Sequence, residues 1–159
     1  MADETTRGNV TKLLVIDDDP SMVRLLESIL TESLKDCVEI ESLTDPEQAR
    51  QRILESSIDI LLTDLEMPGI NGLELLRCAK RRNAFTQVLF LTGHSTRSAL
   101  LDAMELGATD YILKPVNKDE LLELVSQAHS RRQRWIRALA GTWRKASAES
   151  AEEATAAAK

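Results

Sequence analysis

The stretch "LLTDLEMPGING", residues 61–72, decides which fold is expected for this chain. An apolar run ends in Asp64, and a Met-Pro-Gly turn and an Asn-Gly pair follow before a helix-like segment. A carboxylate at the end of a buried strand is costly unless another group stabilises its charge. Asp64 is therefore the residue that the rest of the sequence must explain.

Outward from this stretch, short apolar runs alternate with segments of helical period. The expected strands are residues 12–17, 37–43, 58–64, 87–92 and 109–114. The expected helices are residues 20–34, 45–56, 71–82, 95–106 and a last helix from Asn117 onward. Five strand–helix repeats require right-handed crossovers, which give a mostly parallel sheet with helices on both faces. The sequence therefore predicts a doubly wound α/β domain of the (βα)5 type.

Composition and charge narrow the class of protein. The chain has 159 residues, of which 43% are hydrophobic and 29% are charged, as is typical of one soluble globular domain. No apolar run approaches the roughly 18 residues of a membrane helix, and the polar N-terminus has no secretory signal, so we expect a cytoplasmic protein without membrane contact. Residues 1–128 hold 13 basic and 23 acidic residues, which argues against nucleic-acid binding by this part.

The predicted strands deliver polar residues to one edge of the sheet. The first ends in the triplet Asp17-Asp18-Asp19, the third in Asp64, the fourth in Thr92-Gly93 and the fifth in Lys114-Pro115. Ligands of such sheets bind at the carboxyl ends of the strands. Carboxylates this close together need a cation, and a hard divalent ion such as Mg²⁺ suits them. With a lysine and a hydroxyl nearby, this set is suited to placing a phosphoryl group on Asp64.

Four segments carry a family resemblance. They are "LLVIDDDPSMVRLL" (13–26), "ILLTDLEMPGINGLELL" (60–76), "VLFLTGHS" (88–95) and "GATDYILKPV" (107–116). Together they resemble the receiver domain of two-component response regulators over about residues 11–128. The resemblance implies a flavodoxin-like fold, with a parallel five-stranded sheet in the order 2-1-3-4-5. It also implies a CheY-like signalling module rather than an enzyme, apart from Mg²⁺-dependent phosphorylation and dephosphorylation of itself. The short segment after the last helix is expected of a stand-alone receiver or of one truncated before its output domain.

The resemblance assigns roles to the residues at the strand ends. Asp64 would accept a phosphoryl group from a histidine kinase or phosphotransfer protein, with Mg²⁺ or Mn²⁺ as cofactor. Asp18 would bind the metal directly, Asp17 would act largely through water, and Glu66 would contribute its backbone carbonyl. These assignments predict a metal site built around the acceptor.

Three further residues would form the switch. Lys114 would contact the phosphoryl oxygens, and its bond to Pro115 is expected to be cis. Thr92 would turn toward the new phosphoryl group, and Tyr111 would swing inward behind it. Phosphorylation would thereby change partner binding or self-association.

Four neighbouring residues keep two interpretations each. Glu66 and His94 either tune the lifetime of the phosphoryl group or are ordinary exposed loop residues. Gly93 either leaves the path to the acceptor open or is a turn glycine. Asp19 is either a third acid at the metal or, as we favour, the N-cap of the following helix.

Two other classes of function remain to be weighed. Haloacid-dehalogenase-like phosphatases also use Asp, Thr or Ser, and Lys, but they need a second Asp where this chain has Glu66. They also carry their acidic metal pair after the lysine, whereas Asp17 and Asp18 precede Lys114. A degenerate receiver that only binds partners would lack an acid, the acceptor or the lysine, and all of these are present.

The ends of the chain lie outside the family pattern. Residues 1–10 are expected to be disordered, and residues 129–145 to form a basic amphipathic extension of the last helix. Residues 146–159 are Ala/Glu-rich and are expected to be disordered, too few for a folded output domain. The extension, with Trp135 and Trp143, is a candidate for pairing with a protein, including a homodimer, or for folding back on the domain. Nucleic-acid contact is the least favoured alternative.

Overall fold

The computed structural model describes residues 10–158, so the expected disorder of residues 1–10 falls almost entirely outside the described part. The strands are β1 (Thr11–Ile16), β2 (Val38–Leu43), β3 (Ile60–Asp64), β4 (Gln87–Thr92) and β5 (Asp110–Leu113). The helices are α1 (Pro20–Leu34), α2 (Pro46–Glu55), α3 (Gly72–Arg82), α4 (Arg97–Glu105) and α5 (Lys118–Ala157).

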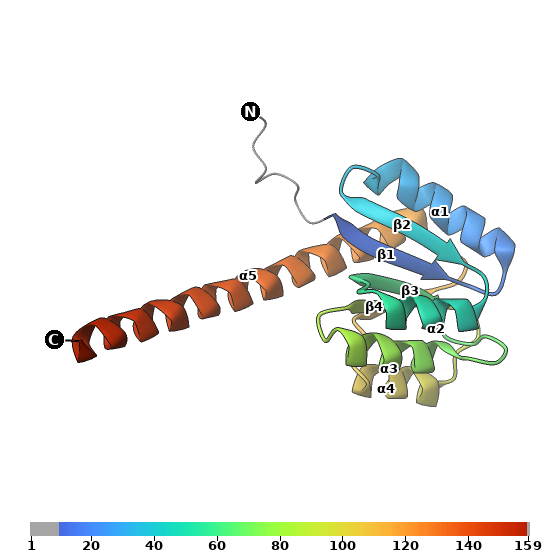
Figure 1. Cartoon of the computed structure of the whole chain (residues 1–159). Coiled ribbons are helices and arrows are strands. Elements are labelled where there is room, and N and C mark those ends of the chain that lie inside the picture. Colours follow the sequence, from blue (N-terminus) through green and yellow to red (C-terminus); the bar gives the residue numbers. More distant parts are fainter. Residues whose placement is uncertain (1–9, 159) are drawn as a thin grey trace.

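The strands form one parallel sheet in the order β2-β1-β3-β4-β5, as predicted (Figure 1). Every residue of β3 and β4 is buried, because helices cover both faces of the sheet. One apolar cluster around Phe90 packs under α2, α3 and α4, and a second around Leu26 and Val125 packs under α1 and α5. The doubly wound prediction is therefore confirmed, and the carboxyl ends of the central strands meet at one edge.

Polar side chains fix where the helices begin. Asp19, Asp45, Asn71, Thr96 and Asn117 each accept a backbone N–H of the first helical turn. Each satisfies a donor that the helix itself leaves free. For Asp19 the acceptor bond comes from the Ser21 N–H at 2.8 Å, so the favoured capping interpretation of this residue is confirmed.

The loop after Asp64 folds tightly back over the end of β3. The Gly72 N–H donates to the Leu65 carbonyl at 2.9 Å. A Cβ on Gly72 would overlap the backbone oxygen of Asp64 and would lie 2.8 Å from Cε1 of Phe90. Glycine is therefore required here by close approach of the backbone, and it sets the distance between α3 and the strand that carries Asp64.

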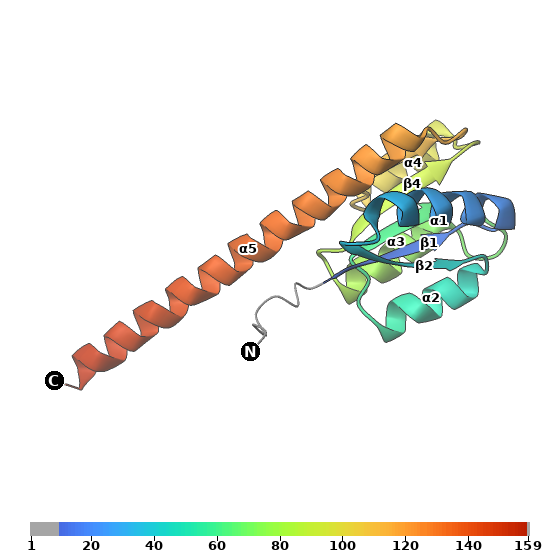
Figure 2. The ribbon, with the colours of Figure 1, turned by 90° about the horizontal axis from the view of Figure 1, so that it is seen from above.

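Helix α5 is longer than the sequence predicted. The expected disorder from residue 146 is wrong, because the helix continues to Ala157. Residues 146–157 are rich in alanine and glutamate, which are strong helix formers, and they contain neither glycine nor proline. The alternative in which the tail folds back is also wrong, since Figures 1 and 2 both show the helix running away from the domain.

An ion pair anchors α5 to the base of the sheet. Arg132 Nη2 lies 2.5 Å from Oδ1 of Asp59, the residue before β3, and both side chains are 7% exposed. The second carboxylate oxygen of Asp59 accepts the Lys12 N–H at 2.8 Å. Arg132 thus occupies a position in the apolar stripe and ties α5 to β1 and β3 at the edge opposite Asp64. Within residues 10–158, no helix is both long and apolar enough to cross a membrane.

The crowding at Gly72 leads to a prediction about stability. Gly72→Ala should lower the free energy of unfolding by about 1–3 kcal/mol, because the added methyl group has no room. Gly141→Ala, in an open stretch of α5 with no neighbouring atoms within 4 Å, is the matched control and should not lower it. Urea denaturation followed by circular dichroism measures both changes. Equal stability of the two variants would refute the close-approach argument.

Candidate functional site

Three carboxylates meet at the carboxyl edge of the sheet. Asp17 and Asp18 follow β1 directly, and Asp64 is the last residue of β3. Because Ile16 is in register with Thr63, Asp17 and Asp64 lie side by side on neighbouring strands. One carboxylate oxygen from each of Asp17, Asp18 and Asp64 lies within 4.8 Å of the others. The structure therefore brings together the acidic cluster that the strand ends predicted.

Lys114 reaches this cluster from the end of the edge strand β5. It follows β5, and its Nζ donates to Asp17 Oδ2 at 2.8 Å and to Asp64 Oδ2 at 3.1 Å. The peptide bond between Lys114 and Pro115 is cis, as expected. One ammonium group thus joins the two buried carboxylates.

The electrostatics of the cluster are unbalanced. Burial raises the pKa of Asp64, hydrogen bonding and charge attraction from Lys114 oppose that rise, and the neighbouring charge of Asp17 adds to it. Burial alone would lower the pKa of Lys114, but hydrogen bonds to Asp17 and Asp64 outweigh it and the net shift is upward. A single ammonium faces three carboxyl groups, so the site favours an additional cation.

The donor set fits a hard divalent cation. Asp17, Asp18 and Asp64 supply oxygen ligands only, which is the preference of Mg²⁺ and of Mn²⁺. Asp18 is exposed and has room for water, whereas Asp17 is buried and its Oδ1 already accepts the Asp19 N–H at 2.9 Å. The direct role expected for Asp18 and the indirect role expected for Asp17 stay predictions. The Glu66 backbone carbonyl lies in the adjoining loop and is the further candidate ligand.

The hydroxyl of Thr92 lacks a partner. Thr92 ends β4 one residue after Leu91, which is in register with Asp64. Its Oγ1 is buried and makes no hydrogen bond within the described part of the chain. An unpaired buried hydroxyl costs about 1–3 kcal/mol, so its retention at this edge suggests a partner that arrives there.

The remaining loop residues have no side-chain contact that fixes a role, although the Glu66 backbone N–H donates to Asp64 Oδ1 at 3.3 Å. Glu66 and His94 are exposed. A Cβ on Gly93 would lie 3.6 Å from Cβ and Cδ of Lys114, which is ordinary van der Waals contact. Both interpretations of these three residues therefore stay predictions.

Tyr111 points outward in this structure. Its side chain is 46% exposed, and beside it lies a cavity of about 260 Å³ between β4, β5 and α4. Phe90, Leu100 and Met104 contribute apolar walls to this cavity. An inward swing of the ring has space available, although the sequence carried no signal for the cavity itself, because its walls belong to ordinary amphipathic elements.

With this geometry in place, comparison with known proteins identifies the class. The family model described as the response regulator receiver domain matches residues 13–126. The chain therefore belongs to the receiver domain family of two-component response regulators. The family that the four sequence segments indicated is thus confirmed.

Individual relatives agree with this family. The chain is similar to the DNA-binding transcriptional regulator NtrC of Klebsiella pneumoniae, with 37% identity over 116 residues, which are 73% of this chain and 24% of that protein. It is also similar to the response regulator ArlR of Staphylococcus saprophyticus, with 35% identity over 124 residues, 78% of this chain and 54% of that protein. The chain spans only about a quarter of the NtrC relatives, so their output functions do not transfer with the match.

Solved structures show the same fold. A response regulator receiver domain from Clostridium thermocellum aligns with a TM-score of 0.70 and 30% identity, covering 77% of this chain and 97% of that one. A CheY-like receiver domain from Methanospirillum hungatei aligns with a TM-score of 0.72 and 24% identity, covering 79% and 98%. Most of each solved domain is thus matched by the (βα)5 part of this chain.

The acidic cluster leads to a prediction about metal binding. Asp18→Asn should weaken Mg²⁺ binding roughly tenfold or more, because it removes a charged oxygen ligand at an accessible position. Asp19→Asn is the matched control, since asparagine also caps helices and Asp19 is engaged at the start of α1. Isothermal titration calorimetry with Mg²⁺ compares the two. An equal loss in both variants would contradict the ligand assignment.

Proposed function

We propose that this domain accepts a phosphoryl group on Asp64 from a histidine kinase or phosphotransfer protein and switches its interactions in response. The observation that carries the proposal is the arrangement around Asp64. Its carboxylate stands at the sheet edge 3.1 Å from the Lys114 ammonium, and the unpartnered hydroxyl of Thr92 ends the adjacent strand. Family membership supports the same role.

The residues of the chain divide the chemistry among them. A carboxylate oxygen of Asp64 attacks the phosphorus atom of the donor in line with the leaving group. The bond between phosphorus and the leaving group breaks as the new P–O bond to Asp64 forms. The Lys114 ammonium neutralises charge on the phosphoryl oxygens and holds Asp64 in place. A divalent cation held by Asp17, Asp18 and Asp64, when bound, supplies further charge neutralisation.

The proposed chemistry is confined to the domain's own carboxylate. Hydrolysis of the acyl phosphate returns Asp64 to its free state, and no second substrate is involved. Glu66 stands where an Asp-x-Asp phosphatase needs its second Asp, and its side chain is exposed. We therefore place the chain among switches rather than enzymes with separate substrates, and in the cytoplasm, where ATP supplies kinases.

The switching surface that we propose lies on α4 and β5. Thr92 gains a hydrogen-bond partner when a phosphoryl group is present, and its movement frees space for Tyr111. The exposed apolar residues there are Leu101, Met104, Tyr111 and Leu113. An inward Tyr111 would change this surface, and with it the affinity for a partner.

The acceptor assignment is tested by chemical phosphorylation. A small-molecule phosphodonor with Mg²⁺ should add one phosphoryl group to the wild-type protein, and a chelator should prevent the reaction. Asp64→Asn should not be labelled, because its side chain is no longer a nucleophile. Asp19→Asn should be labelled as the wild type is. Intact-mass spectrometry reads all four samples, and labelling of the Asp64→Asn protein at the wild-type level would refute the assignment.

The role of Thr92 is tested by separating phosphorylation from its consequence. Thr92→Val keeps the size and removes the hydroxyl, so the protein should still be labelled on Asp64. The phosphorylation-dependent change in amide hydrogen exchange over α4 and β5 should then fall by at least about half, because the new hydrogen bond is missing. Thr92→Ser restores the hydroxyl and should restore the response. An undiminished response in Thr92→Val would exclude the proposed coupling.

A further inference from the structure

Beyond the domain, α5 continues as a helix with an uncovered apolar stripe. Arg132 is its last buried residue, and every residue from 141 to 158 is exposed. Trp135, Leu139 and Trp143 are 58%, 39% and 69% exposed. Most of the stability of a helix in a protein comes from packing of its apolar face, and residues 141–158 of α5 pack on none of the described residues of the domain. Large exposed apolar side chains in a row indicate a surface that another helix covers.

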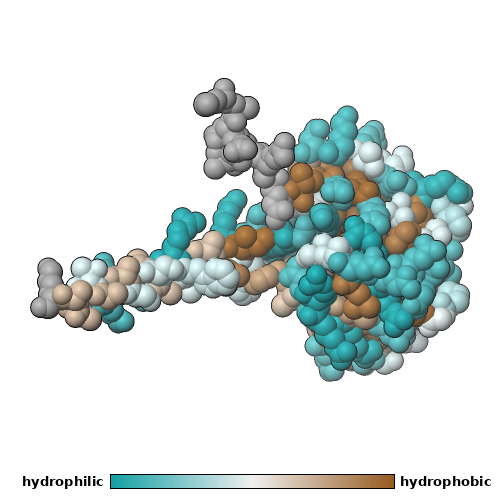
Figure 3. All heavy atoms as spheres, in the orientation of Figure 1, coloured by the Kyte–Doolittle hydropathy of each residue, from teal (hydrophilic) through white to brown (hydrophobic). Residues whose placement is uncertain are grey.

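The stripe is bulky in its first half and small in its second. Trp135, Leu139 and Trp143 continue the face that Leu121 and Val125 turn toward the sheet. Further along, at the same helical spacing, stand three small residues and one acid, namely Ala146, Ser150, Glu153 and Ala157. The space-filling view shows the change from brown, apolar atoms near the domain to paler ones along the helix (Figure 3). In an antiparallel pair, the bulky half of each helix faces the small half of the other.

The charges along the extension favour the same orientation. Its first half is basic, with Arg131, Arg134 and Lys145, and its second half is acidic, with Glu149 and Glu152. In a parallel pair of identical helices, like charges would stand at the same height. In an antiparallel pair with Trp143 near the centre, Arg134 of each copy stands level with Glu152 of the other. A two-fold axis between the copies then produces the same contact twice.

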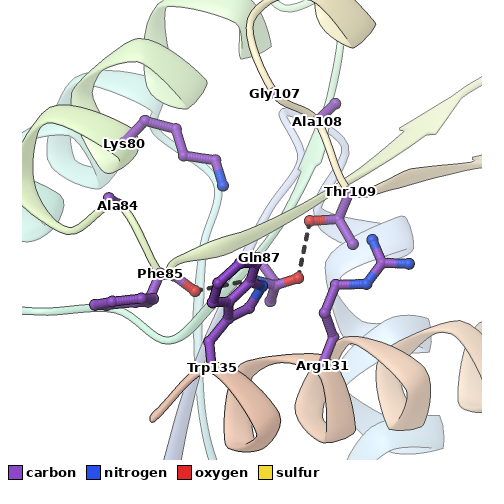
Figure 4. Close-up of a pocket in the computed structure, with 9 residues that line it drawn as sticks. All are labelled: Lys80, Ala84, Phe85, Gln87, Gly107, Ala108, Thr109, Arg131 and Trp135. Carbon is purple, nitrogen blue, oxygen red and sulfur yellow. Dashed lines mark hydrogen bonds between the residues drawn. The ribbon is translucent and has the colours of Figure 1, made fainter. Parts of the chain in front are cut away.

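A cavity lined by basic residues lies where the acidic second half of a partner's α5 would arrive. A hollow of about 320 Å³ at the amino end of the sheet is lined by Lys80, Gln87, Arg131 and Trp135, among others, and none of the lining residues is acidic (Figure 4). Lys80 donates to the Thr86 carbonyl at 2.7 Å and has no carboxylate partner within residues 10–158. Burial and the charge of Arg131 lower the pKa of Lys80, which fits an unneutralised pair of cations.

We propose that two copies of this chain pair through the extensions of α5 in antiparallel orientation, with the Glu149–Glu153 segment of each copy beside Arg131, Arg134 and the Lys80 cavity of the other. The extension leaves the domain at the amino end of the strands, whereas Asp64 lies at the carboxyl end (Figure 2). Pairing therefore leaves both acidic sites free and does not depend on phosphorylation, so it goes beyond the proposed function.

Charge exchange between two variants tests the pairing and its direction. Light scattering coupled to size exclusion should show a wild-type dimer. Arg131→Glu with Arg134→Glu, and separately Glu149→Lys with Glu152→Lys, should each weaken the dimer at least about tenfold, because like charges then meet. An equimolar mixture of these two variants should form a dimer again, since both contacts become complementary. This recovery also shows that each variant is folded.

The control reverses two charges on the side of the same helix that faces away from the stripe. Arg137→Glu with Arg144→Glu changes the net charge by the same amount and should leave the dimer intact. Asp64→Asn should dimerise like the wild type. A monomeric wild type at about 100 µM, or a mixture that stays monomeric, would overturn the proposal. Unweakened pairing of the Arg131→Glu, Arg134→Glu variant would overturn the antiparallel orientation. If the wild type binds a DNA duplex and this variant does not, the extension is a nucleic-acid surface instead.

Discussion

One ammonium group between two buried carboxylates holds the functional edge together. Lys114 comes from the last strand and bonds to Asp17 from the first and Asp64 from the third, which lie in the middle of the sheet. Without that charge, two adjacent carboxylates at the ends of buried strands would repel each other in a poorly solvated place. The parallel order of the strands is what allows residues 97 and 50 positions apart in sequence to meet there.

The sequence predicted the features that depend on local interactions or on a regular spacing of apolar residues. The alternation of apolar runs and helical stripes predicted all five strands and five helices, and the cap at Asp19 followed from residue type. The edge cluster could be predicted because parallel strands point their carboxyl ends the same way.

Features that depend on tertiary contact or on a balance of weak propensities were not predicted. Arg132 is a charged residue in an apolar stripe, and its partner Asp59 lies 73 positions earlier, where nothing in the local sequence marks it. The helix after residue 146 was missed because an alanine-rich acidic tail has the composition of both a solvated helix and a disordered segment. The cavity beside Tyr111 was missed because a void is defined by what surrounds it.

Asp19 connects two parts of the molecule that are usually considered separately. Its side chain begins α1 by accepting the Ser21 N–H, and its own N–H donates to Oδ1 of Asp17. The orientation of a carboxylate in the acidic cluster and the first turn of α1 therefore depend on one residue. The acidic cluster is in this way joined to the start of a surface helix by two hydrogen bonds that do not involve Asp64.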